Sequence, residues 1–283
     1  MMLIFGHGYV SRFLMEQMHP LNYKVYCTSR QVKQPIRKGN IEILNFFDPI
    51  LPSIIDSSHL ILTTIPPDDA GVDPVLERYS QYLSKTTCKW IGYLSSTSVY
   101  GNHHGAWVDE KTQCTPSHRE SKWRLFAEKA WLNLYVKYKL PVHIFRLSGI
   151  YGPNRNCLEE IKKGKKSTIV KSGQYFSRIH MVDICQAILA SIDSPIGGEI
   201  FNISDDEPAP LHLVHQFGAD ILNEPPLKEI SFEKAELSKR AQSFFYDNKK
   251  VSNQKLKNCL GFECKYPNYR TGLLEGCLPF LKR

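Results

Sequence analysis

The sequence lacks the features that mark several classes of protein. Its eight cysteines include no CxxC pair, and no histidine follows Cys259 and Cys264 at a zinc-binding spacing. No apolar run approaches the roughly 20 residues of a membrane-spanning helix. Glycines interrupt the first apolar run, unlike a signal peptide. These absences predict a cytoplasmic protein with reduced thiols, no membrane association and no metal site.

The composition is typical of a globular protein, with more basic than acidic residues. Hydrophobic residues make up 42% and charged residues 23% of the 283 residues, enough for one large core with a small lobe. Lysine and arginine number 36 against 28 acidic residues, a net charge of +8. Such a charge suits nucleic acid or phosphate-bearing small molecules. Because no nucleic-acid-binding motif accompanies it, we expect a small-molecule partner and no nucleic acid, in a monomer or homodimer.

A glycine turn near the start of the chain is the clearest functional signal. The stretch Leu3–Ser11 runs from an apolar segment through Gly6-His7-Gly8 into an amphipathic segment. Gly6 permits a tight turn, and Gly8 has no Cβ to keep a pyrophosphate away from the backbone. A helix beginning at Tyr9 and Val10 would offer backbone N–H groups to phosphates. The pattern predicts a dinucleotide-binding βαβ unit with Ser11 in place of the third glycine; a βα turn without a ligand is the alternative.

Apolar strands alternate with helical segments along most of the chain. The expected strands are residues 24–28, 41–44, 59–65, 89–94, 141–147 and 199–204, in addition to the first, and the clearest helices are 73–84 and 119–138. This alternation predicts an α/β, Rossmann-type, doubly wound parallel sheet. The pattern is less regular after Pro153. We therefore expect a single dinucleotide-binding domain, with a cofactor-binding core mainly in residues 1–153 and a smaller C-terminal substrate lobe mainly in 154–283.

Ligands of such sheets bind beyond the carboxyl ends of the strands, where several polar residues fall. No acid that could bind a ribose 2′-OH ends the second strand. Arg30 stands there instead, and its guanidinium suits a 2′-phosphate. This favours NADP, with NAD possible, although a solvated arginine is the alternative. The predicted cofactor-binding residues are Gly6, Gly8, Tyr9, Val10, Arg30, Asp48, Thr63, Thr64 and Ser95.

A basic stretch follows the sixth expected strand of the sheet. It includes Arg155, Lys163 and Lys166. One interpretation is a clamp for a diphosphate-bearing substrate, and the other is a solvated charged face. Together with Arg178 and His180 further along, these residues form the predicted substrate-binding set.

Five motifs in order give the chain a family resemblance. They are residues 6–11 (GHGYVS), 94–101 (LSSTSVYG), 146–153 (RLSGIYGP), 179–183 (IHMVD) and 201–204 (FNIS). In this respect the chain resembles the extended short-chain dehydrogenase/reductase superfamily, the NAD-dependent epimerases and dehydratases. Residues 107–110 and 176–180 look most like an atypical branch described as nucleoside-diphosphate-sugar epimerase-like. The resemblance implies a nicotinamide cofactor and a substrate similar to a nucleotide sugar.

The resemblance also implies catalytic residues, but part of the pattern is missing. In the family, a serine or threonine after the fifth strand holds the substrate oxygen, which corresponds to Ser96 with Thr97 adjacent. A tyrosine and a lysine four residues later complete the site, since positions i and i+4 share one helix face. Alignment through Glu128 puts Glu120 and Arg124 at those two positions. A surface ion pair is an equally good interpretation of these two residues.

Other side chains must therefore donate the proton if the protein is an enzyme. Tyr100 and Tyr151 follow strand ends and are the predicted catalytic tyrosines beside Ser96 and Thr97; packing of either ring beneath a loop is the alternative. Two hypotheses remain open. The chain is an NAD(P)-dependent oxidoreductase or epimerase with a non-standard site, or it is a catalytically silent NADP(H)-binding sensor or partner-binding protein.

Overall fold

The computed structural model describes residues 1–18, 23–194 and 196–281, and the chain divides into two compact units. Unit 1 comprises residues 1–96, 119–146 and 185–201, and unit 2 comprises residues 97–118, 147–184 and 202–283. The chain thus alternates between the units and is not divided once near residue 153. The assignment of cofactor binding to residues 1–153 and of substrate binding to 154–283 stays a prediction.

Unit 1 is built on a mostly parallel sheet of eight strands. They run in the order β12 (Glu199–Ile203), β8 (Val142–Leu147), β6 (Trp90–Ser96), β5 (Leu60–Thr63), β1 (Met2–Phe5), β2 (Val25–Ser29), β4 (Ile41–Asn45) and β3 (Ile36–Lys38). β3 pairs antiparallel with β4, whereas β1 pairs parallel with both β2 and β5. From β4 to β8 this is the strand order 3-2-1-4-5-6 of a Rossmann fold. The predicted fold class is confirmed.

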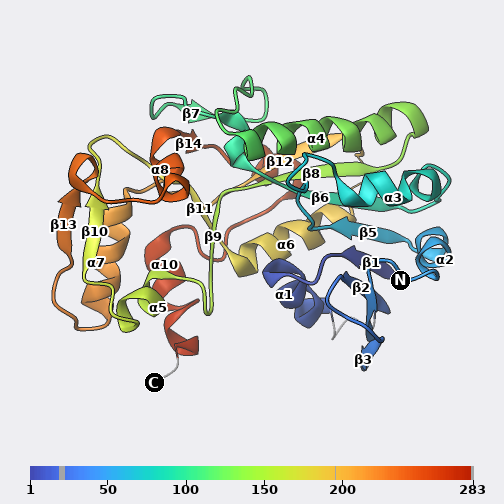
Figure 1. Cartoon of the computed structure of the whole chain (residues 1–283), viewed down its shortest axis with the longest axis horizontal. Helices are drawn as coiled ribbons and strands as arrows, with labels where there is room; N and C mark the ends of the chain where they lie inside the picture. Colours follow the sequence, from blue (N-terminus) through green and yellow to red (C-terminus); the bar gives the residue numbers. More distant parts are fainter. Residues whose placement is uncertain (19–22, 195, 282–283) are drawn as a thin grey trace. The chain divides into compact units, whose positions relative to one another are not determined.

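Helices cover the sheet of unit 1 because its strands are apolar on both faces. The helices are α1 (Tyr9–Met18), α2 (Leu51–Ser57), α3 (Pro74–Leu83), α4 (Arg119–Tyr138) and the later part of α6 (Met181–Ile192). One core cluster joins Phe5 and Tyr93 of the sheet to Tyr79 of α3 and Trp131 of α4. In Figure 1, α3 and α4 lie on one side of these strands and α1 on the other. The sheet is therefore wound on both faces, as the near-continuous apolar strands predict.

Asp73 defines the start of α3 and anchors it to α4. Its Oδ1 accepts hydrogen bonds from the backbone N–H groups of Val75 and Leu76, at 2.9 and 3.0 Å. Its Oδ2 accepts a hydrogen bond from the indole N–H of Trp131, at 2.8 Å. Burial raises the pKa of Asp73, and these three hydrogen bonds lower it. The N-cap residue of α3 thus also fixes how two helices pack.

Unit 2 contains short paired strands between helices. The strand pairs are β9 (Gly149–Tyr151) with β11 (Arg178–His180), β10 (Ser167–Val170) with β13 (Lys228–Ser231), and β7 (Trp107–Val108) with β14 (Lys250–Val251). The helical segments are η2 (Thr97–Tyr100), α5 (Cys157–Lys162), α7 (Leu211–Ile221), η3 (Phe232–Lys234), α8 (Lys239–Tyr246), α9 (Gln254–Leu260), α10 (Tyr269–Leu274) and η4 (Leu278–Phe280). The less regular pattern after Pro153 corresponds to these short elements.

The cysteines serve mainly as core residues. Five of the eight have buried side chains, and burial raises the pKa of Cys27 and of Cys157 to about 12. Thiols with such pKa values are poor nucleophiles. In residues 1–18, 23–194 and 196–281, no helix is long and apolar enough to cross a bilayer. Nor does this described part of the chain bring together three or more acidic, histidine or cysteine side chains that could hold a metal ion.

Candidate functional site

The glycine turn lies where the strand order of the sheet reverses. β1 has β2 on one side and β5 on the other, so the ends of β1 and β5 flank the switch point. The backbone N–H of Thr64 donates to the carbonyl of Phe5 at 2.9 Å. A Cβ on Gly6 would lie 2.5 Å from Oγ1 of Thr64, and Gly6 has φ +104°. Ligands of Rossmann-type sheets bind at such a point, so the predicted residues Gly6, Thr63 and Thr64 stand at the expected place.

Ser11, which replaces the third glycine of the motif, ties this turn together. Its hydroxyl is buried and donates to the carbonyl of Gly6 at 2.5 Å. It also lies 3.1 Å from Oγ1 of Thr64. On the other side, the N–H of Gly6 donates to Oγ1 of Thr28 at 3.2 Å. The buried hydroxyl of Ser11 is therefore hydrogen-bonded and stabilises the turn. The replacement of the third glycine by serine thus leaves the turn intact.

Gly8 is the one position of the turn where a side chain would meet no protein atom. Nothing lies within 4 Å of the place where its Cβ would be. Its carbonyl accepts the N–H of Arg12 at 3.1 Å, so Gly8 is the N-cap of α1. The first turn of α1 carries no acidic residue. Open space above a helix N-terminus without nearby carboxylates is suited to an anion.

Arg30 and Asp48 follow β2 and β4 at the same edge of the sheet. Arg30 is exposed, and the described part of the chain gives its guanidinium no carboxylate partner. Asp48 is half-buried, and its Oδ1 accepts the N–H of Ile50 at 3.0 Å just before α2. Arg30 is thus available to a ligand, while the carboxylate of Asp48 already holds a turn. Their cofactor-binding roles stay predictions.

The hydroxyl of Ser95 is used inside unit 1. It donates to Oε1 of Glu128 at 2.5 Å. Arg146 donates to the same carboxylate through Nε, at 3.1 and 3.2 Å, and through Nη2, at 2.7 Å. The side chains of Glu128 and Arg146 are 1% and 4% exposed. This buried ion pair holds the end of β6 against α4 and β8. The Ser95 hydroxyl, which was predicted to bind the cofactor, is thus already hydrogen-bonded to Glu128.

Glu120 and Arg124, at the positions predicted for the family's tyrosine and lysine, have different surroundings. The Glu120 side chain is 74% exposed and lies 4.0 Å from Arg119. Arg124 is half-buried and donates through Nη1 to the carbonyl of Leu94 at 2.9 Å. The exposed Glu120 therefore has the surroundings of a surface carboxylate, whereas Arg124 holds the C-terminal end of strand β6.

Three sequence motifs meet in one hydrogen-bond network of unit 2. The buried hydroxyl of Tyr100 donates to Oδ1 of Asn202 at 2.7 Å. The N–H of Asn202 donates to Oε1 of Glu110 at 2.7 Å. Thr97, also buried, donates to the carbonyl of Leu147 at 3.4 Å, and Ser96 is the half-buried last residue of β6. These contacts support a packing role for Tyr100; the catalytic roles of Ser96, Thr97 and Tyr100 stay predictions.

Tyr151 and His180 are direct partners in the pairing of β9 with β11. Their ring centroids lie 5.1 Å apart. The Tyr151 hydroxyl donates to the carbonyl of Asn268 at 3.3 Å, and a Cβ on Gly272 would lie 2.0 Å from it. Burial raises the pKa of Tyr151, which makes it a poor proton donor in this environment.

His180 is a neutral imidazole within the core of unit 2. Its Nδ1 accepts the N–H of Val182 at 3.2 Å. Its pKa is lowered to about 4, mainly by burial and also by the nearby Lys265, while a hydrogen bond with the backbone of Gly276 raises it. The ring also contacts Tyr266, with centroids 4.2 Å apart, and Nε2 lies 3.8 Å from Sγ of Cys277. A neutral ring cannot act as a cation toward a phosphate at pH 7.

We expect His180 to make the protein less stable in acid. Its folded pKa lies below the ordinary 6.5, so its contribution to stability is complete above pH 6.5 and is lost as the pH falls toward 4. The shift corresponds to about 3 kcal/mol at most. Urea unfolding at several pH values should therefore give a shallower slope for His180→Gln than for the wild type. A control, His59→Gln at an exposed position, should keep the wild-type slope, and equal slopes for all three proteins would contradict the assignment.

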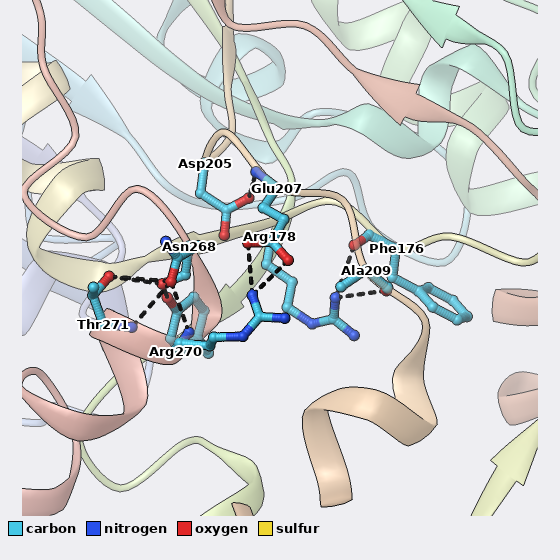
Figure 2. A network of polar contacts seen from close by, with 9 residues as sticks. Phe176, Arg178, Asp205, Glu207, Ala209, Asn268, Arg270 and Thr271 are labelled. Atoms are coloured by element: carbon cyan, nitrogen blue, oxygen red, sulfur yellow. Dashed lines mark hydrogen bonds and ion pairs between the residues drawn. The ribbon is translucent and has the colours of Figure 1, made fainter. Parts of the chain in front are cut away.

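The half-buried Arg178 and the buried Asp205 belong to one network of polar contacts in unit 2 (Figure 2). Nη1 of Arg178 donates to the carbonyls of Phe176 and Ala209, at 2.8 and 2.9 Å. Asp205 is 1% exposed, and its Oδ1 accepts the N–H of Glu207 at 3.3 Å. Burial raises the pKa of Asp205, and Arg178 lowers it. Sequence reasoning named Arg178 but missed Asp205, whose signal is an acid directly after an apolar strand.

The residues of the basic stretch are exposed and paired. Lys163 lies 3.9 Å from Glu159, and Lys166 lies 3.8 Å from Glu224; both lysine side chains are 76% exposed. Arg155 is also exposed. Such pairs are solvated and contribute little energy. The arrangement favours the solvated-face interpretation, and the diphosphate clamp stays a prediction.

Comparison with known proteins gives one family match. Residues 75–204 match the model of the NAD dependent epimerase/dehydratase family. The Escherichia coli K12 protein YeeZ is 28% identical over 228 residues, which cover 77% of this chain and 75% of YeeZ.

Solved structures resemble the chain over nearly its whole length. A functionally unknown conserved protein from Silicibacter pomeroyi is 41% identical, with a TM-score of 0.89 and 96% of each chain covered. The dTDP-glucose 4,6-dehydratase of Bacillus anthracis, in complex with NAD, is 20% identical, with a TM-score of 0.78. That match covers 97% of this chain and 94% of the dehydratase, and at this identity it shows the fold alone.

Proposed function

Because the chain belongs to the NAD-dependent epimerase/dehydratase family, we propose that it binds NADP(H) and acts as an oxidoreductase or epimerase on a nucleotide-sugar-like substrate. The observation that carries the proposal is the glycine turn at the switch point of the sheet. Gly6 closes the turn on Thr64, and Gly8 leaves open space at the N-terminus of α1. A dinucleotide pyrophosphate has the charge and shape for that space.

The residues of unit 1 fit a nicotinamide dinucleotide. Gly6, Gly8, Tyr9 and Val10 would hold the pyrophosphate, and Arg30 would hold a 2′-phosphate. The buried Oγ1 of Thr63, at the end of β5, has no hydrogen-bond partner within the described residues. A bound nicotinamide supplies a site for hydride transfer, and the chain contributes binding and orientation.

Arg30 should make NADPH bind more tightly than NADH. A charge-assisted contact to the 2′-phosphate contributes about 1.5–3 kcal/mol, which corresponds to roughly tenfold to a hundredfold in Kd. Calorimetry with both cofactors measures this ratio directly. Arg30→Ala should remove the preference and leave NADH binding unchanged.

Arg37→Ala is a matched control for this experiment. Arg37 is another arginine of the β2–β4 region, with a side chain 75% exposed and paired with Glu42 at 3.0 Å. This variant should keep the wild-type preference. Equal affinity of the wild type for NADPH and NADH would exclude the 2′-phosphate contact, and failure to bind either cofactor would exclude the proposed function.

The substrate class is inferred from the family and a structural relative. The dehydratase that shares this fold is named for a nucleotide sugar and is seen with NAD. Nucleotide sugars carry a diphosphate and several hydroxyl groups, and Arg178, Arg155, Lys163 and Lys166 offer donors to such groups. Proton donation by Tyr100 or Tyr151 would require their hydroxyls to leave Asn202 and Asn268.

A second candidate function is cofactor binding without turnover. It is favoured by the residues at the positions predicted for the family's tyrosine and lysine. Glu120 is exposed, and Arg124 donates a hydrogen bond to the carbonyl of Leu94. NADPH oxidation assayed with a set of nucleotide sugars separates the two candidates. Bound NADPH that no substrate oxidises would favour a sensor or partner-binding protein.

A further inference from the structure

The guanidinium of Arg178 is only partly used by the protein. Both carbonyls that it contacts, those of Phe176 and Ala209, are reached by Nη1. In the described part of the chain, Nε and Nη2 have no hydrogen-bond acceptor. These two nitrogens form the edge of the guanidinium that donates two parallel hydrogen bonds. Figure 2 shows the side chain directed at the two carbonyls, which fix its orientation.

Asp205 provides an acceptor beside this donor. Its N–H donates to the carbonyl of Arg178 at 2.7 Å, so the two residues are joined through the backbone. Oδ2 is buried and has no hydrogen-bond partner within residues 1–18, 23–194 and 196–281. An unpaired buried carboxylate oxygen is costly. The charge of Arg178 also lowers the pKa of Asp205, so the two side chains are close enough to interact, although neither uses all of its hydrogen-bonding atoms within the described residues.

Ser148 and Gly149 border the same place. The N–H of Ser148 donates to the carbonyl of Ile203 at 3.0 Å, two residues before Asp205. The hydroxyl of Ser148 is buried and also has no partner among the described residues. Gly149 pairs directly with Arg178, and a Cβ on Gly149 would lie only 3.2 Å from the carbonyl oxygen of Ser177 and 3.8 Å from Cγ of Arg178. Three segments that are neighbours through their backbones thus bring polar atoms without a hydrogen-bond partner among the described residues to the start of β9 and β11.

We propose that Arg178 and Asp205, with Ser148, form a subsite that recognises adjacent hydroxyl groups of a sugar. A hydroxyl group accepts a hydrogen bond from Arg178 while donating one to Asp205, so one pair of hydroxyls satisfies both side chains. A phosphate or carboxylate would accept from Arg178 but would be repelled by Asp205. This inference rests on the proposed function and adds to it, because it assigns these residues to the sugar and not to the diphosphate.

The test compares a nucleotide with and without its sugar. Calorimetry with dTDP and dTDP-glucose, and with UDP and UDP-glucose, gives the gain in affinity due to the sugar. Asp205→Asn keeps an oxygen for the N–H of Glu207 but places an NH2 group toward Arg178. We expect it to reduce the gain by about tenfold and to leave the Kd of dTDP and UDP unchanged. Arg178→Lys, which keeps the charge but loses the second nitrogen of the edge, should act in the same way.

Glu207→Gln is the matched control. Glu207 lies two residues from Asp205 but pairs at the surface with Arg270, at 2.6 and 2.8 Å, so the sugar-dependent gain should persist. Urea unfolding confirms that each variant is folded. A wild type that binds the sugar nucleotides no more tightly than dTDP and UDP, or an Asp205→Asn variant with the full gain, would overturn the subsite. If no nucleotide binds while NADPH does, the nucleotide-sugar assignment fails together with the subsite, and the cofactor assignment stands.

Discussion

Gly8→Val is expected to abolish NADPH binding while the protein remains folded. The valine side chain would occupy the open space at the N-terminus of α1, and a β-branched residue there excludes a pyrophosphate from the backbone. The expected loss in affinity is at least about a hundredfold, since phosphate binding depends on this close approach. Stability should fall by less than about 1 kcal/mol, because the substitution changes only an N-cap residue. Calorimetry and urea unfolding measure the two effects separately.

Gly6→Val provides the contrasting variant. Its Cβ would lie 2.5 Å from Oγ1 of Thr64 and 2.9 Å from Cγ1 of Ile65, at a φ of +104°. Both the crowding and the backbone conformation disfavour any side chain there. We therefore expect Gly6→Val to lower both stability and binding. Undiminished NADPH affinity in Gly8→Val would show that the turn does not hold the pyrophosphate.

The fold of unit 1 could be predicted because its signals are local and repeated. Apolar runs such as 59–65 and 89–94 mark buried strands, and they correspond to Leu60–Thr63 and Trp90–Ser96. The antiparallel edge strand Ile36–Lys38 could not be predicted in this way. It has three exposed residues and is defined by pairing with β4, not by burial. The two-residue strands β7 and β14 could not be predicted either, because they too are defined by their pairing.

The surroundings of the candidate catalytic residues could be predicted only in part. Because Ser95 and Tyr100 follow a predicted strand, they could be expected near the carboxyl edge of the sheet. The directions of their hydroxyl groups could not be predicted from this. Ser95 donates to Glu128, and Tyr100 donates to Asn202, which lies 102 residues away. Such partners depend on the tertiary fold and leave no periodic pattern in the sequence. The unpaired Oδ2 of Asp205 could not be predicted either, because only the folded structure shows that this oxygen is buried without a hydrogen-bond partner within the described residues.

The sequence motifs themselves are explained by these contacts. Residues 149–151 and 178–180, from two separate motifs, are paired strands, and Tyr100, Glu110 and Asn202 connect three more segments. These contacts therefore help to assemble unit 2. All of these residues lie within the stretch 75–204 that matches the family model, so this part of the match reflects how unit 2 is assembled.

Glu128→Leu is expected to lower the free energy of unfolding more than any other single change discussed above. The carboxylate holds Arg146 with three contacts of 2.7 to 3.2 Å and accepts the hydroxyl of Ser95. Without it, the buried guanidinium of Arg146 loses the charge of Glu128, and breaking such a buried pair costs about 3–5 kcal/mol. Urea unfolding measures the loss, and NADPH calorimetry shows whether the end of β6 remains in place.

The double variant Glu128→Leu with Arg146→Met separates charge from packing. Apolar residues of similar size in place of a buried pair are often neutral, so the double variant should recover most of the stability that Glu128→Leu loses. Glu120→Gln on the same helix is the control, since that carboxylate is 74% exposed and should change stability by less than about 0.5 kcal/mol. Equal losses in the single and double variants would mean that Glu128 acts through packing and through Ser95, and that its charge is not needed to balance Arg146.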